Sequence, residues 1–210
     1  MFGIKILEER ESKYNGHLVV SKSLGFGTYI QADGLTQSGG IVTDIWKGTL
    51  KKVKSKKGQV KSALILGLGG GTVVKLIQKN WPDSKITGID IDPAIVELGK
   101  KYLGLDKDRV EIIIGNAYQK SEELKSKNEK FDLVIVDLYN GDKFPKEFES
   151  IYYIQLMRTV LSGNGIVIFN RLYYKEKKIL AEQFGEKLKK SFGKVGYFRP
   201  VSNLMFICSK

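Results

Sequence analysis

The stretch ALILGLGGGTVVKLI, from Ala63 to Ile77, places four glycines between an apolar run and a helical pattern. Glycines at such a turn accept positive φ and let a ligand approach the backbone closely. The dinucleotide fingerprint G-x-G-x-x-G/A fails, because its sixth position is Thr72, and no Gly-Lys-Ser/Thr follows for a Walker phosphate loop. The remaining alternatives are the sulfonium of an adenosylmethionine or a tight turn that binds nothing.

From residue 62 onward, apolar runs alternate with helical periods. The predicted strands are Ala63–Leu66, Ile86–Ile89, Val110–Ile114, Leu133–Val136 and Ile166–Phe169. The predicted helix faces are marked by Val73, Leu76 and Ile77, by Ile95, Leu98 and Tyr102, by Tyr153, Leu156, Met157 and Val160, and by Leu180, Phe184 and Leu188. Runs so rich in Ile, Leu and Val are typical of parallel strands covered on both faces. The alternation predicts a doubly wound α/β sheet, with two final antiparallel strands joined through residues 200–203.

A different pattern precedes this α/β part. Short strand-like pieces with glycine turns, including Asp33-Gly34, predict a small antiparallel β unit before residue 45. Residues 41–50 predict a short helix, and the run from Lys47 to Lys61 contains no acidic residue. We therefore divide the chain into a small N-terminal β domain (1–50), a basic connector (51–61) and an α/β domain (62–210).

The composition excludes several classes of protein. Among the 210 residues there is one cysteine, Cys208, so no internal disulfide can form, and we expect this thiol to be buried. One histidine, His17, leaves no Cys/His cluster for zinc, and no G-x-S-x-G elbow is present, so we expect no metal and no serine-type hydrolase. No apolar run approaches the roughly 20 residues that span a bilayer, and the N-terminus becomes charged too early for a secretory signal. We expect a cytoplasmic protein with no membrane partner.

The net charge of +12 raises a nucleic-acid hypothesis. The lysines are spread over many segments, which favours a solvated basic surface over a polyanion-binding site. Nucleic acid therefore stays an alternative partner.

In doubly wound sheets, ligands bind outside the carboxyl ends of the strands. Asp90 ends the second strand of the α/β part, where a carboxylate can accept hydrogen bonds from both ribose hydroxyls. Asp92, before Pro93, is expected to cap the next helix. Asn116 follows the third strand and can contact an adenine amino group, cap a helix, or do both, and Ala117 can offer its backbone N–H.

Asp137 follows the fourth strand of this part. A buried carboxylate is costly unless it meets a cation or solvent, and a sulfonium or an amine would supply that cation. Tyr139, Asn140 and Asp142 follow on a glycine-containing loop that can lie over the site. Asn170 and Arg171 end the fifth strand at the same rim.

Four segments together resemble the spermidine synthase superfamily of class I adenosylmethionine-fold transferases. They are LILGLGGGT, ITGIDIDPAIVELGKKYLGL, RVEIIIGNAYQ and FDLVIVDLYNGDKFP, and the stretch YNGHLVV…ADGLTQSGG resembles the small β domain of that family. The resemblance implies a Rossmann-like methyltransferase sheet of seven strands behind a small antiparallel β domain. It also implies a small-molecule amine substrate and suggests a homodimer.

The resemblance assigns roles to particular positions. It implies a site for S-adenosylmethionine, its decarboxylated form or methylthioadenosine at Gly67, Gly69, Gly70, Gly71, Asp90, Ile91, Asn116 and Ala117. Asp137 would assist the amine nucleophile together with Tyr139 as the catalytic residues. The acceptor would contact Gln37, Asn140 and Asp142.

Three positions depart from the family pattern. Gly70 stands where spermidine synthases carry an Asp that helps hold the aminopropyl amine, and Asn140 stands where they carry a second Asp. The stretch IVTDIWKG replaces a Tyr-His-Glu motif. These missing groups favour methyl transfer to a small molecule over aminopropyl transfer to a diamine. An RNA methyltransferase and a non-catalytic nucleoside-binding protein are the further alternatives.

Overall fold

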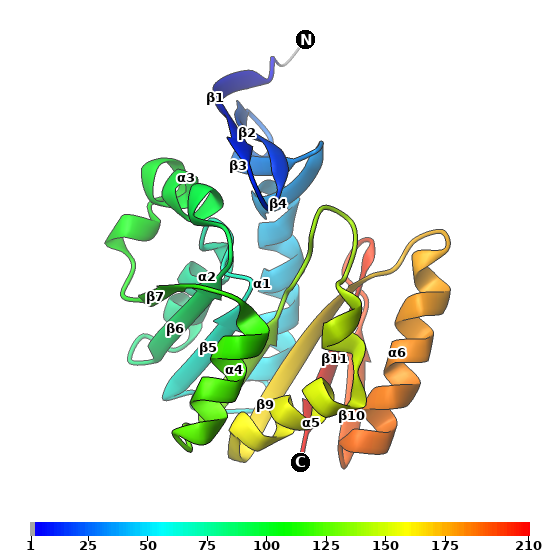
Figure 1. Cartoon of the computed structure of the whole chain (residues 1–210). Helices are drawn as coiled ribbons and strands as arrows, with labels where there is room; N and C mark the ends of the chain where they lie inside the picture. The colour runs from blue at the N-terminus through cyan, green and yellow to red at the C-terminus, as the bar shows by residue number, and fades with distance from the viewer. Residues whose placement is uncertain (1–2) are drawn as a thin grey trace.

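Two sheets organise the chain, and the computed structural model describes residues 3–210 of it (Figure 1). The smaller sheet is antiparallel, with its strands in sequence order. Its strands are β1 (Lys5–Ser12), β2 (Gly16–Ser23), β3 (Gly27–Ala32) and β4 (Leu35–Gly39). The small N-terminal β unit expected from the turn residues is therefore present.

Helix α1 (Gly40–Lys54) begins directly after β4 and runs down from the small sheet along the large one (Figure 1). It is longer than the helix predicted at residues 41–50 and includes the first four residues of the predicted connector. Buried Val53 continues the apolar face of Trp46 and Leu50 past the predicted end. Three lysines in its last turn interact favourably with the carboxyl end of the helix.

The larger sheet has seven strands in the order β10-β11-β9-β8-β5-β6-β7. All neighbours are parallel except β11, which is antiparallel to both β9 and β10. The strands are β5 (Ser62–Leu66), β6 (Lys85–Asp90), β7 (Glu111–Ile114), β8 (Phe131–Val136), β9 (Leu161–Leu172), β10 (Lys194–Phe198) and β11 (Asn203–Ser209). The predicted doubly wound seven-strand sheet and its antiparallel end are confirmed.

Helices cover both faces of this sheet. Besides α1, they are α2 (Thr72–Asn80), α3 (Pro93–Leu103), α4 (Ala117–Ser126), α5 (Ile151–Val160) and α6 (Lys177–Ser191), with 3₁₀ turns η1 (Leu105–Lys107) and η2 (Lys146–Glu149). Alternate strand residues divide the core: Ala63 and Ile65 face α1, α2 and α3, whereas Leu64 and Leu66 face α4, α5 and α6. Cys208 is buried on the second side, as expected. Across residues 3–210 no helix combines the length and the apolar character that a bilayer crossing requires.

Two details of the helices differ from the sequence prediction. Helix α4 was not predicted from periodicity, because its ten residues AYQKSEELKS carry few apolar side chains. Leu180 was expected on the buried face of α6 but is 47% exposed, and Ala181 is buried in its place. The face of α6 that turns toward the sheet is the one that carries Phe184, whose ring packs on Phe206 of β11.

Polar contacts fix the small sheet over the large one. The buried carboxylate of Asp92 caps α3 by accepting from the Ala94 N–H at 2.9 Å, as predicted. It also accepts from Ser12 Oγ and Asn15 Nδ2, both at 2.6 Å. At the end of β4, the backbone N–H of Gly39 donates to Thr72 Oγ1 at 2.8 Å. These contacts hold β4 directly above the glycine turn.

Candidate active site

A cavity of about 390 Å³ lies at the carboxyl ends of β5, β6, β8 and β9, below β4 and beside α1. Residues of both sheets and of α1 line it. The cavity is at the position expected for a ligand in a doubly wound sheet, where neighbouring connections leave in opposite directions.

The glycine turn after β5 forms one wall. Gly67 (φ 89°) and Gly69 (φ 53°) line the cavity, and both adopt the left-handed conformation. The Gly67 N–H donates to Ile89 O at 2.9 Å, and the Gly69 N–H donates to Asp90 Oδ2 at 2.7 Å. The turn and the end of β6 are thereby held together.

Gly70 and Gly71 are not among the residues that line this cavity. A Cβ on Gly70 would lie 2.8 Å from Leu103 and 2.9 Å from Ile30, and one on Gly71 would lie 2.5 Å from Leu105. The Gly70 N–H donates to Ser38 Oγ at 2.7 Å. These two glycines allow β3, β4, α3 and η1 to pack closely on the turn.

Asp90 lies at the end of β6 on the cavity wall. Burial raises the pKa of its carboxyl to about 6, against the opposing effect of hydrogen bonds from the Asp92 and Gly69 N–H groups. Ile91, beside it, also lines the cavity and is 39% exposed.

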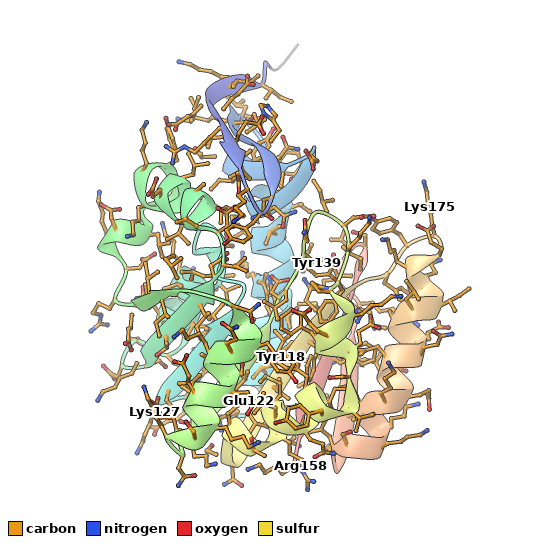
Figure 2. The ribbon with its side chains drawn as sticks, viewed as in Figure 1. Tyr118, Glu122, Lys127, Tyr139, Arg158 and Lys175 are labelled. Carbon is orange, nitrogen blue, oxygen red and sulfur yellow. The ribbon has the colours of Figure 1, made fainter. Side chains whose placement is uncertain are left out.

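Asn116 and Ala117 line the cavity at the start of α4. Asn116 caps the helix, because its Oδ1 accepts from the N–H groups of Tyr118 and Gln119 at 2.8 and 3.2 Å. Phe148 completes an apolar wall here, and its ring packs on that of Tyr118, which Figure 2 labels on α4.

Asp137 follows β8, with its carboxylate facing the cavity from the protein interior. Its Oδ2 accepts from Trp46 Nε1 at 3.0 Å, and its Oδ1 accepts from Asn170 Nδ2 at 2.7 Å. Burial raises the pKa of this carboxyl to about 6, although both hydrogen bonds act in the opposite direction. Asn203 Nδ2 in turn donates to Asn170 Oδ1 at 2.8 Å. Side chains from α1, β9 and β11 thus orient one carboxylate.

Sequence reasoning missed Trp46 and Asn203. Trp46 lies in IVTDIWKG, the stretch that departs from the family motif, and this departure was the available signal. The sequence pattern places Asn203 only in the turn before the last strand. Its amide is buried, and nothing local in the sequence indicates the contact with Asn170.

Tyr139 lines the cavity, near the middle of the molecule in Figure 2. Its hydroxyl donates to Asn170 O at 3.2 Å and accepts from the Leu172 N–H at 2.8 Å. Burial raises the pKa of this phenol. These contacts give the hydroxyl a positioning role: it holds the loop after β8 against β9.

The three predicted acceptor residues lie in different surroundings. Gln37 lines the cavity, and its buried Nε2 has no hydrogen-bond partner among residues 3–210. Asn140 also lines the cavity. Asp142 lies outside it, beside a second hollow nearer the surface, and forms an ion pair with Lys177 at 2.9 Å.

Residues 49–202 match the family described as the spermine/spermidine synthase domain. The match covers more than half of the chain, so the chain belongs to this family, as the sequence motifs predicted.

Named relatives include transferases of two kinds. A polyamine aminopropyltransferase of Vibrio vulnificus is 26% identical over 129 residues, 59% of this chain and 43% of that protein. Polyamine aminopropyltransferase 1 of Hyperthermus butylicus is 27% identical over 204 residues, 86% of this chain and 70% of that protein. An eEF1A lysine and N-terminal methyltransferase homolog of Drosophila melanogaster is 25% identical over 55% of this chain and 18% of that protein. The chain thus spans less than half of some relatives that it matches.

Solved structures share the fold. A spermidine synthase in complex with the transition-state analogue AdoDATO has a TM-score of 0.76 at 16% identity, over 98% of this chain and 73% of that one. Human methyltransferase-like protein 13 in complex with SAH has a TM-score of 0.64 at 19% identity, over 80% of this chain and 79% of that one. At these identities the likeness establishes the fold alone.

Proposed function

We propose that this chain transfers an aminopropyl group from decarboxylated adenosylmethionine to the nitrogen of an amine. The observation that carries the proposal is the charge of the cavity. Its charged lining residues among residues 3–210 are Asp90, Asp137 and Glu147, all acidic, although the whole chain has a net charge of +12. Such a lining attracts a sulfonium and an amine and repels a polyanion such as RNA.

The residues present fit an adenosine joined to a sulfonium. The Asp90 carboxylate is available to ribose hydroxyls, next to the positive-φ turn at Gly67 and Gly69. Asn116 and Ala117 would bind the adenine. The positive sulfur of the nucleoside would activate the carbon bonded to it, so that a nucleophile can attack that carbon.

In the proposed reaction Asp137 orients the acceptor amine and receives its proton. The nitrogen forms a bond to carbon as the carbon–sulfur bond breaks, and the electron pair leaves with the thioether. Because Trp46 and Asn170 fix both carboxylate oxygens, the base is held in one orientation before the amine enters. Positioning and proton transfer would account for most of the rate increase.

Methyl transfer from intact adenosylmethionine is the second candidate. Gly70 offers no carboxylate for an aminopropyl amine, and some relatives are named as methyltransferases. The more extensive matches are to aminopropyltransferases, which favours the first candidate over the methyl transfer expected from the missing acidic groups.

Isothermal titration with the two nucleosides, followed by mass spectrometry of the products, tests this assignment. We expect decarboxylated adenosylmethionine to bind at least about tenfold more tightly, a difference of about 1.4 kcal/mol. We expect an acceptor mass increased by one aminopropyl group. Tighter binding of the intact nucleoside with a methylated product would establish methyl transfer instead. Failure of both nucleosides to bind would refute both candidates.

The nucleoside affinity should depend on pH through Asp90. Its pKa of about 6 means that the carboxylate is charged at pH 7 and mostly protonated at pH 5. The affinity should therefore fall by about tenfold between these pH values, if only the charged form accepts both ribose hydrogen bonds. Titration calorimetry on the wild type and on Asp90→Asn measures this. The variant should bind more weakly at pH 7, and its affinity should not fall toward pH 5. A full tenfold fall in the variant would mean that a group other than Asp90 titrates.

A further inference from the structure

The cavity has two halves with different lining. Over β5, β6 and the start of α4 lie the groups proposed for the nucleoside. The other half lies over β8, β9 and β11 and against α1. Its lining residues are Leu35, Thr36, Gln37, Ile41, Val42, Ile45, Trp46, Asp137, Tyr139, Asn140, Asn170, Leu172, Ser202 and Asn203. We call this second half the acceptor half.

Asp137 is the one charged side chain of residues 3–210 that lines the acceptor half. We assign the third acidic lining residue, Glu147, to the nucleoside half because of the packing of the residue that follows it. Its neighbour Phe148 packs on Tyr118 of α4 and Tyr153 of α5, with ring centroids 6.4 and 4.9 Å apart.

The rest of the acceptor half is apolar or neutral. Ile41, Val42, Ile45 and Trp46 form a continuous wall on α1, and Leu172 of β9 adds to it. Apart from Asp137, the polar side chains of the acceptor half are amides and hydroxyls. Two of the amides are already hydrogen-bonded, because Asn203 donates to Asn170 and Asn170 donates to Asp137.

One carboxylate in an otherwise neutral subsite can compensate one positive charge. Both donors on Asp137 are neutral, so its charge remains available to a single nitrogen of the acceptor. A second ammonium would lie against the apolar wall of α1 without a counter-charge, and burying an unpaired charge is strongly unfavourable.

We propose that the acceptor half takes a primary amine with one nitrogen and an uncharged, mainly apolar body, in preference to a diamine. The inference rests on the proposed function and specifies its substrate class. The bond made joins the alkylamine nitrogen to the aminopropyl carbon, the bond broken is carbon to sulfur, and the proton goes to Asp137. The product is an N-alkyl-1,3-diaminopropane.

The test compares amines of matched length with decarboxylated adenosylmethionine as donor: butylamine against 1,4-diaminobutane, and hexylamine against 1,6-diaminohexane. Released thioether and product mass give kcat/KM for each. We expect each monoamine to exceed its diamine by at least about tenfold, as one uncompensated charge implies. Equal values, or a preferred diamine of either length, would overturn the inference and leave aminopropyl transfer standing. The longer diamine also tests whether a second nitrogen reaches Asp33 and Asp142 in the outer hollow.

A failure of another kind would concern the proposed function itself. If no amine gains mass with this donor, aminopropyl transfer is refuted, and the inference fails with it.

Val42→Glu adds the missing counter-charge to the α1 wall. Val42 is partly exposed to the cavity, so the new carboxylate can face the acceptor. We expect the diamine-to-monoamine ratio of kcat/KM to rise by about tenfold. Two variants serve as controls. Val42→Gln introduces a side chain of the size of glutamate without its charge, and Thr43→Glu adds the charge one residue away, outside the cavity lining. Neither control should change the diamine-to-monoamine ratio of kcat/KM by more than about twofold. An unchanged ratio in a folded Val42→Glu protein would contradict the proposal, and if that variant does not fold, the wild-type comparison decides it alone.

Discussion

Asp137→Asn is expected to lower kcat/KM by about 10³-fold, within the range found for loss of a general base. The amide has the same shape as the carboxylate but cannot accept the proton of the amine. It also turns one donor toward Trp46 or Asn170, which donate to the native carboxylate. Nucleoside affinity, measured by calorimetry, should stay within about threefold, because Asp137 lies in the acceptor half.

The pH profile provides the second measurement for this variant. With a pKa of about 6, the wild-type carboxylate becomes protonated as the pH falls through 6, so activity should fall on that side. With the nucleoside saturating, so that the titration of Asp90 does not limit binding, the kcat of Asp137→Asn should lose this acidic limb. Asp44→Asn, the same change at an exposed position of α1 outside the cavity, should retain wild-type activity and profile. A loss below about fivefold, with the acidic limb intact, would mean that another group takes the proton.

Gly67→Ala is expected to destabilise the chain by about 3 kcal/mol and to remove activity with it. Two effects contribute to this loss of stability. The first is the backbone conformation, because a φ of 89° is unfavourable for alanine by about 1 kcal/mol. A Cβ here would also overlap the backbone carbonyl oxygen of Asp137, and backbone cannot move aside as a side chain can. Relief of the overlap would displace Asp137 itself. Denaturant unfolding of both proteins measures the loss in the free energy of unfolding.

Gly27→Ala is the matched control for this prediction. Gly27 has a φ of 67°, but a Cβ there would meet nothing within 4 Å. We expect a cost of about 1 kcal/mol from the backbone conformation alone. Equal costs at the two positions would show that the close approach of Asp137 to Gly67 contributes nothing to stability.

Much of the fold was predictable because its signals are local. Continuous apolar runs mark strands that are covered on both faces, and a period of 3.6 marks the buried face of a helix. These patterns predicted the seven strands of the large sheet and most of its helices. Helix α4 was the exception: its stability comes from the cap at Asn116 and from packing on α5, neither of which produces a strong apolar period. Leu180 shows the same limit, because two faces of α6 carry apolar residues and the sheet selects one.

By itself, the sequence determined that Asp90, Asn116 and Asp137 meet at one edge, since parallel strands bring their carboxyl ends together. Only the tertiary structure decided what surrounds Asp137. Its partner Trp46 is 91 residues away along the chain, and Asn170 is 33 residues away. A Cβ on Gly70 would point toward Ile30 and Leu103 and not toward the cavity, and this direction likewise depends on how the small sheet docks. Such contacts follow from packing between distant elements, which no local period encodes.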